Sequence, residues 1–159
     1  MKLKISGDKL TLASAHMLTR HDKCARIHGH NYNIEVEAEG EVDENGMLID
    51  FGIFKTNVGK IIKQYDHRIL IPEYNKDLNI SIIDDQIIIE TCEGKFYRFP
   101  KDDVILLPLE ATTVELLAKY FHHLIKEQYP QFKITIIMAE TPTSVVSYTE
   151  ENNKIENNT

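Results

Sequence analysis

Three side chains that bind metals or transfer protons lie close together in residues 24–32, which read CARIHGHNY. Successive side chains of a strand point to opposite faces of a sheet, so His28 and His30 share one face. Two imidazoles placed in this way can reach one metal ion. Cys24 is near enough to lie at the same site without being a ligand. An isolated His-x-His pair is as often two ordinary surface histidines, so the interpretation depends on the rest of the chain.

A third histidine, His16, ends a predicted strand over residues 10–16 and is a candidate third ligand. The segment after it, residues 17–23, reads MLTRHDK and is predicted to be a loop. Basic side chains gather in and just after this loop, at Arg20, Lys23 and Arg26. They form either an ordinary solvated loop or a binding place for an anionic group such as a phosphate chain.

Other polar groups lie at the ends of predicted elements. Asp66 and His67 follow a predicted helix, where they are either a charge interacting with the helix dipole or a proton relay. Without further context the first interpretation is favoured. Glu140 follows the apolar run ITIIMA and is either a solvated strand end or a ligand-binding carboxylate.

Two further groups are given no role in a site. His122 and His123 are neighbours on a predicted helix and point about 100° apart, so we expect surface or helix-end residues that do not share a metal. Cys92 lies in a predicted turn without metal-ligand spacing around it.

Composition narrows the class of protein. A chain of 159 residues predicts one domain, and its net charge of −7 argues against a general nucleic-acid binder. Two cysteines indicate a reducing compartment rather than a disulfide framework. The start lacks the apolar region of a signal peptide, and no apolar run approaches the ~20 residues of a membrane-spanning helix. We therefore expect a cytoplasmic protein that binds neither nucleic acid nor membrane.

Periodicity predicts an α+β fold, an antiparallel sheet with two helices packed on one face. The predicted helices begin at the cap Asp50 and at a capping box over residues 112–115, and end near residues 65 and 129. Strands are predicted over residues 3–5, 10–16, 31–41, 47–49, 134–140 and 145–149. A single domain is expected over residues 1–149, with a β-rich insertion at about 71–109 whose short strands cover residues 80–83, 86–91 and 96–99. The polar tail 150–159 is expected to be disordered.

Several of these pieces together resemble the 6-pyruvoyl-tetrahydropterin synthase and 6-carboxytetrahydropterin synthase family. The matching pieces are SAH ending at His16, CARIHGHNY, GMLIDFGIFK from Gly46, DHRIL from Asp66, TTVELLA from Thr112, and AET ending at Thr141. They follow the family's order and cover most of the chain outside residues 71–109. The resemblance implies the tunnelling-fold type and a homo-oligomer, a trimer or a hexamer, with sites between subunits.

The resemblance also implies a role for each candidate residue. The zinc ligands would be His16, His28 and His30. The general acid/base would be Cys24, poised by Asp66 and His67. The pterin ring would be anchored by Glu140 and touched by Thr112 and Thr113. The basic residues Arg20, Lys23 and Arg26 then become candidate contacts for a triphosphate.

The implied substrate is 7,8-dihydroneopterin triphosphate. The spacing of Cys24 to HGH without an insertion is similar to that of 6-carboxytetrahydropterin synthases, which release acetaldehyde and supply 7-deazaguanine synthesis (queuosine and archaeosine precursors). The pyruvoyl branch usually has a longer segment there, and a folate-related branch carries a glutamate where this chain has Ile27. The alternatives are the 6-pyruvoyl-tetrahydropterin synthase reaction and a zinc- and pterin-binding protein without turnover. The chain departs from the family at Met17, where many members have arginine, and in its longer segment 71–109.

Overall fold

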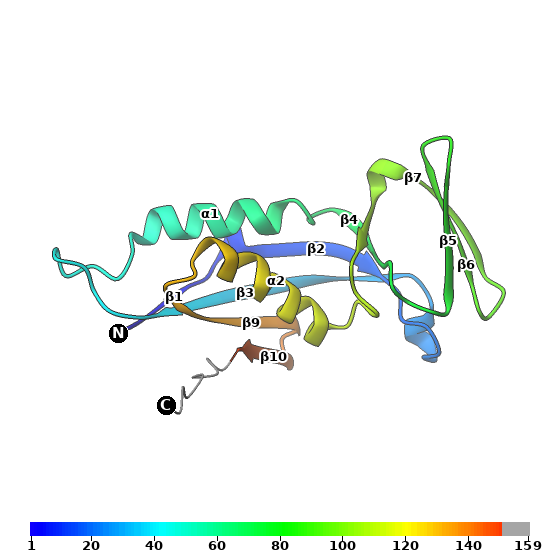
Figure 1. Ribbon diagram of the computed structural model, residues 1–159. Coiled ribbons are helices and arrows are strands. Elements are labelled where there is room, and N and C mark those ends of the chain that lie inside the picture. The colour runs from blue at the N-terminus through cyan, green and yellow to red at the C-terminus, as the bar shows by residue number, and fades with distance from the viewer. Residues whose placement is uncertain (151–159) are drawn as a thin grey trace, which may run out of the picture.

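The computed structural model describes residues 1–150, in which two β-sheets and two α-helices are formed. The main sheet contains β1 (Lys2–Ile5), β2 (Thr11–His16), β3 (His28–Glu39), β4 (Arg68–Pro72), β8 (Val104–Leu107), β9 (Lys133–Thr141) and β10 (Ser144–Thr149). Its order is β10-β9-β3-β2-β4-β8, and β1 pairs with β3 (Figure 1). The tail predicted to be disordered falls, from residue 151 on, outside the described residues.

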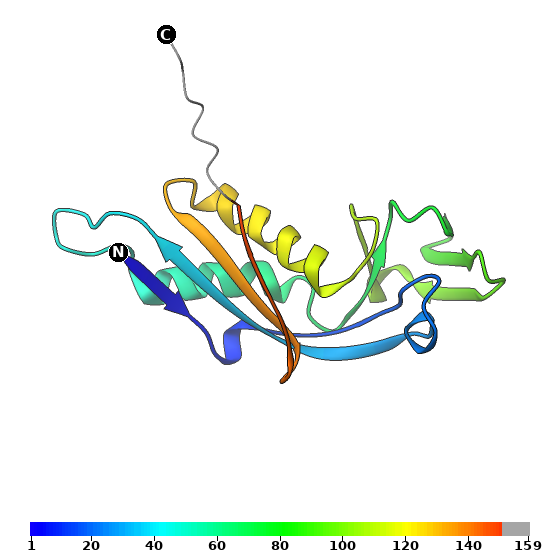
Figure 2. The same ribbon diagram turned by 90° about the horizontal axis from the view of Figure 1, so that it is seen from below.

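Both helices, α1 (Phe51–Lys63) and α2 (Val114–Gln128), pack on one face of the main sheet (Figures 1 and 2). The large core between them is built from the alternate residues of the strands and the apolar stripes of the helices, and it includes Leu12, Ile34, Phe54, Leu117 and Phe121. The predicted α+β fold with two helices on one face is therefore confirmed. Neither described helix combines the length and the apolar character that crossing a membrane requires.

The caps of the helices explain where they begin. The carboxylate of Asp50 accepts the backbone N–H of Ile53 at 2.8 Å, as predicted for an N-cap. For α2 the capping residue is Thr113, whose hydroxyl accepts the N–H of Leu116 at 3.5 Å. The predicted capping box starting at Thr112 is wrong by one residue, because the Thr112 hydroxyl instead donates to the carbonyl of Met17 at 3.4 Å.

Strand pairing in the main sheet is mostly but not wholly antiparallel. The pairs β2–β3, β3–β9, β9–β10 and β1–β3 are antiparallel, whereas β2–β4 and β4–β8 are parallel. Each parallel pair is joined by a long connection, which runs through β3 and α1 for β2–β4 and through residues 73–103 for β4–β8. The short strand predicted at residues 47–49 is wrong. There the Asp43 carboxylate accepts the N–H groups of Asn45 and Met47, both at 2.9 Å, and holds a turn.

The second sheet contains β5 (Leu78–Ile83), β6 (Gln86–Thr91) and β7 (Phe96–Pro100), which pair in this order and antiparallel. It lies within the predicted β-rich segment, whose two ends belong instead to β4 and β8 of the main sheet. Both views place this three-stranded sheet at one end of the molecule, near the loop that follows β2 (Figures 1 and 2). The division of the chain into one domain and an insertion stays a prediction.

Candidate functional site

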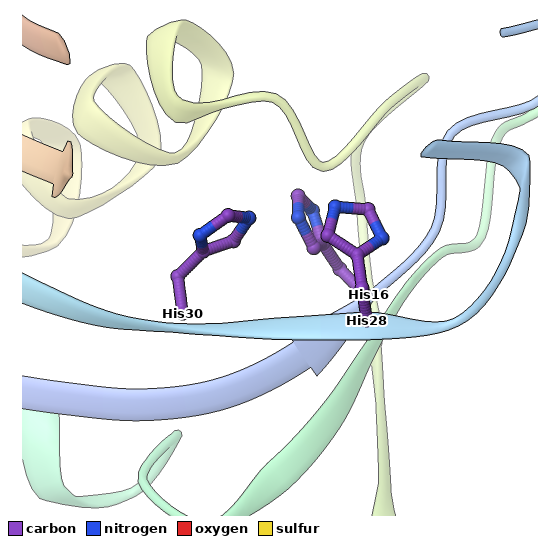
Figure 3. A group of neighbouring side chains, drawn as sticks. All are labelled: His16, His28 and His30. Atoms are coloured by element: carbon purple, nitrogen blue, oxygen red, sulfur yellow. The ribbon is translucent and has the colours of Figure 1, made fainter. Parts of the chain in front are cut away.

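The three predicted metal ligands are brought together by the pairing of β2 with β3. His16 lies directly opposite His28 in the register, and His30 lies two residues further along the same face. One ligand atom from each histidine lies within 4.8 Å of the others, and the rings point toward one another (Figure 3). The register between His16–His28 and Thr11–Asn33 is continuous. The histidines therefore extend the core face of Tyr32 and Ile34.

Backbone carbonyls fix the orientation of two of these rings. The Nδ1 atoms of His16 and His28 lie 2.8 Å from the carbonyl oxygens of Thr112 and Arg26. Because a carbonyl oxygen only accepts, Nδ1 carries the proton in both rings and Nε2 is left with a free lone pair. Metal-binding histidines typically donate their other N–H in this way, so the donor set fits a zinc ion.

Burial keeps one of the three imidazoles neutral. The side chain of His16 is 2% exposed, and this burial lowers its pKa from 6.5 to about 4, against the smaller opposing effect of the Thr112 carbonyl. His28 and His30 are half-buried and face a pocket. Three imidazoles that leave one side open are the arrangement of a catalytic rather than a structural zinc site.

Cys24 lies in the same pocket as the histidines. The pocket is lined by His16, Leu18, Lys23, Cys24, Arg26, Ile27, His28, His30 and Glu140. The thiol is half-buried on the short 3-10 turn Lys23–Ala25. Cys92 is exposed in the turn between β6 and β7 and is not among the lining residues.

Glu140, near the end of β9, reaches the histidine cluster. Its Oε1 atom lies 3.4 Å from Nε2 of His30 and 3.8 Å from Nε2 of His16. The fully buried Tyr32 places its hydroxyl 3.5 Å from Nε2 of His16. Burial first, and then the neighbouring Glu140, raise the pKa of Tyr32. Sequence reasoning gave Tyr32 no role in the site, and the available signal was its place two residues after His30 on the same strand.

The predicted relay pair is formed but does not meet Cys24 within the chain. Asp66 accepts the N–H of Ala13 at 2.9 Å and an ion pair from Lys63, and it lies 3.0 Å from Nδ1 of His67. Burial raises the pKa of Asp66, but these partners outweigh it and lower the pKa to about 2. His67 lines a different pocket, which shares His30 with the pocket of Cys24 and also includes Ala13 and Ala15. Because Ala13 and Ala15 alternate with His16 along β2, their part of the pocket lies on the other face of the sheet.

The remaining predicted contacts divide into two groups. Lys23 and Arg26 line the pocket of Cys24, as a role in binding an anion requires. Arg20 is instead bound by Asp77, with Nε–Oδ2 and Nη2–Oδ1 distances of 2.8 and 2.6 Å. Thr112 is fully buried beside His16, and the hydroxyl of Thr113 caps α2.

The three-stranded sheet holds the loop that carries Cys24. We call residues 17–27 the cysteine loop. Lys95, between β6 and β7, donates from Nζ to the carbonyl of Ala25 at 2.8 Å. Met17 is buried in a cluster with Ile87 and Ile89 of β6. Sequence reasoning missed both Lys95 and Asp77, because neither residue belongs to a motif.

Known proteins similar to this chain are pterin synthases. A family model described as 6-pyruvoyl tetrahydropterin synthase matches residues 7–151. A Pyrococcus horikoshii protein, named provisionally as a 6-carboxy-5,6,7,8-tetrahydropterin synthase, is 37% identical over 130 residues, which are 80% of this chain and 76% of the relative. The 6-carboxy-5,6,7,8-tetrahydropterin synthase of Haemophilus influenzae is 30% identical over 143 residues, 86% of this chain and 92% of the relative.

Solved structures agree on the fold. The crystal structure of Plasmodium vivax 6-pyruvoyl tetrahydropterin synthase superposes with a TM-score of 0.87 at 25% identity, covering 95% of this chain and 98% of that chain. The Caenorhabditis elegans 6-pyruvoyl tetrahydropterin synthase superposes with a TM-score of 0.64 at 20% identity, covering 95% and 96% of the two chains. At 20% identity, the match to the Caenorhabditis elegans structure supports the fold only.

Proposed function

Because the chain belongs to the 6-pyruvoyl tetrahydropterin synthase family, we propose that it is a zinc-dependent lyase of the 6-carboxytetrahydropterin synthase type. It would convert 7,8-dihydroneopterin triphosphate to 6-carboxy-5,6,7,8-tetrahydropterin, with release of acetaldehyde and triphosphate, as a step toward 7-deazaguanines. Family membership confirms the resemblance seen in the sequence and the expectation of a pterin synthase-type enzyme. The observation that carries the finer proposal is the pocket in which three convergent imidazoles, Cys24 and Glu140 meet.

His16, His28 and His30 would hold the zinc through Nε2 in at least the first two cases, since their Nδ1 atoms donate to carbonyls. When bound, the zinc supplies Lewis acidity that lowers the pKa of the substrate's side-chain hydroxyl groups. The open side of the histidine cluster faces the same pocket as Cys24, which supports substrate binding beside the metal.

The chain's own groups would bind the substrate and move its protons. Cys24 would act as the general acid/base at the substrate's side chain. Glu140 would accept the 2-amino and N3–H donors of the pterin as a bidentate pair. Because its Oε1 lies 3.4 Å from Nε2 of His30, the pterin ring would lie next to the metal ligands. Lys23 and Arg26 would attract the triphosphate. Thr112, whose carbonyl binds His16, and Thr113, the cap of α2, would touch the pterin.

We also propose that the protein works as a homo-oligomer, a trimer or a hexamer, in which Asp66 and His67 act on Cys24 of a neighbouring subunit. Two observations support this. Within one chain Cys24 and His67 line different pockets. In the part of the chain that the structure describes, both helices lie on one face of the main sheet, so the other face is free to meet another subunit (Figure 2).

Mixing two inactive variants tests the shared site. Cys24→Ala and His67→Ala should each lose turnover alone. Refolded together in equal amounts, they should recover about a quarter of wild-type activity, because random mixing in a symmetric ring places an intact cysteine beside an intact histidine at that fraction of interfaces. Unchanged inactivity of the mixture, with oligomers formed, would place the relay within one chain or remove it from the mechanism.

The reaction itself is tested by a product assay. Zinc-loaded protein is incubated with 7,8-dihydroneopterin triphosphate, and acetaldehyde and the pterin product are followed by mass spectrometry. We expect acetaldehyde and 6-carboxytetrahydropterin from the wild type and from the matched control Cys92→Ala. Cys24→Ala should bind zinc but make no product. Bound pterin without any turnover of the wild type would favour the non-catalytic alternative.

A second candidate reaction is that of 6-pyruvoyl-tetrahydropterin synthase on the same substrate. The observation in its favour is the TM-score of 0.87 with the Plasmodium vivax enzyme of that name, over 95% of this chain. The higher sequence identity to 6-carboxytetrahydropterin synthases, 37% for the Pyrococcus horikoshii relative, favours the first reaction. A pyruvoyl product without acetaldehyde would decide for the second.

A further inference from the structure

A second group of metal-binding side chains lies where α2 packs against β10. One ligand atom from each of His122, His123 and Glu150 lies within 4.8 Å of the others. The interpretation from sequence, that these histidines are surface or helix-end residues, is wrong for His122, which is buried in the middle of α2. Their Cα–Cβ bonds diverge, but side-chain torsions bring the ring centroids to 5.6 Å. Both rings also lie beside Tyr148 of β10, with centroids 5.1 and 6.4 Å from that ring.

His122 is the fixed member of the group. Its side chain is 1% exposed. Its Nδ1 is the one buried side-chain nitrogen or oxygen, among residues 1–150, without a hydrogen-bond partner. A buried polar atom without a partner is costly, and in native proteins such an atom calls for an explanation, such as a bound ion, an ordered water or a functional role. The proposed function uses neither this atom nor this residue.

The positive charge of Lys126 acts on His122, so its position bears on whether a second cation fits there. Lys126, one helical turn after His122, donates from Nζ to the carbonyl of Pro130 at 3.0 Å and to that of Phe132. Its ammonium group is therefore held by the turn after α2. Glu150 is exposed, and it brings a negative charge to two imidazoles.

We propose that His122, His123 and Glu150 form a second site for a divalent transition-metal cation such as Zn²⁺, separate from the His16–His28–His30 cluster. Two imidazoles and one carboxylate are a donor set that binds zinc in known sites. Ligand atoms on one tetrahedral zinc lie roughly 3.3 Å apart, given metal–nitrogen distances of about 2.0–2.1 Å. The half-buried His123 and the exposed Glu150 are free to close on the fixed His122.

The bound cation would join α2 to the end of β10, at the edge of the main sheet. This site differs from the first in that one of its ligands, Glu150, is exposed, whereas His16 and His28 are held by backbone carbonyls. Less pre-organised ligands bind more weakly, so we expect an affinity about tenfold or more below that of the first site.

Metal counting tests the site without reference to enzyme activity. The untagged full-length chain is dialysed against a small excess of zinc chloride, and bound zinc is measured by mass spectrometry. We expect two zinc ions per wild-type chain and one in His28→Gln, which removes the first site. In the His28→Gln background, His123→Gln or Glu150→Gln should remove the remaining ion. The matched controls His21→Gln and Glu127→Gln, on exposed side chains, should keep it.

Two results would overturn the proposal. One is no bound zinc in His28→Gln alone. The other is a zinc ion that stays bound in His28→Gln when either His123→Gln or Glu150→Gln is added. That ion would then belong to the first cluster. A wild-type protein that forms no product in the product assay would count against the proposed function. It would not change the number of zinc ions bound, so the two proposals can fail separately. His123→Gln and Glu150→Gln alter side chains that are not fully buried, and the zinc retained by these variants in the wild-type background verifies that they fold.

Discussion

The main sheet and the three-stranded sheet serve the site in different ways. The main sheet supplies the histidines and Glu140 from β2, β3 and β9. The three-stranded sheet supplies none of the pocket's lining residues, yet it contacts the cysteine loop through Lys95. The salt bridge of Arg20 with Asp77, just before β5, adds a second contact. The main sheet therefore carries the candidate metal- and substrate-binding groups, whereas the three-stranded sheet carries groups that hold the loop with Cys24.

The substitution His28→Ala is the strongest test of whether the main sheet supplies the metal ligands. Removing one of three ligands should release the metal and lower turnover by about a thousandfold or more, because the Lewis acid is lost. Metal content and acetaldehyde release measure the effect. His21→Ala, an exposed histidine of the cysteine loop, is the control and should behave as wild type. Full turnover by metal-free His28→Ala would refute the assignment.

The main sheet should also make the metal-free protein sensitive to acid. Burial lowers the pKa of His16 from 6.5 to about 4, so below pH 6.5 the unfolded chain binds a proton that the folded chain does not. Stability should therefore fall as the pH drops from 6.5 to 4 and level off below 4, a loss of about 3 kcal/mol from this group. Urea unfolding of the chelator-treated protein measures it. His16→Asn should remove this step, and a slope unchanged in that variant would contradict the prediction.

The part of the three-stranded sheet is tested at Lys95. Lys95→Met keeps the aliphatic stem but removes the hydrogen bond to Ala25, so the turn that carries Cys24 should loosen. We expect kcat to fall about 10- to 100-fold, the scale on which small misplacements act, with zinc content unchanged. Lys95→Arg should rescue part of the rate, and the exposed Lys101→Met should have no effect. Equal kcat values for Lys95→Met and Lys101→Met would show that the three-stranded sheet does not position the loop.

The smallest effects should separate the basic residues. Lys23→Gln and Arg26→Gln should each raise KM about tenfold, because both line the pocket and would meet the triphosphate. Arg20→Gln should raise it only about twofold, because Asp77 already holds the guanidinium at an exposed site where such pairs contribute little. Steady-state kinetics decide, and a larger effect at Arg20 than at Arg26 would assign Arg20 to the substrate.

Sequence reasoning succeeded where a pattern is local. The alternation of side chains predicted that His28 and His30 share one face, and the Asp50 cap predicted the start of α1. It failed where a residue can form either of two local interactions of similar free energy. Thr112 bonds Met17 rather than opening a capping box. Leu48 and Ile49 pack on the core from a turn held by Asp43 rather than from a strand.

The sequence by itself determined the family, the two helices, and the face on which His28 and His30 lie, because side-chain parity and helix caps follow from neighbouring residues. Only the tertiary structure decided that His16 lies opposite His28, that β2, β4 and β8 run parallel, and that Lys95 reaches the cysteine loop. It also decided that His122 and His123 meet Glu150. Periodicity fixes a face but not a partner, because strand register and long-range contacts depend on how all the apolar faces are buried together.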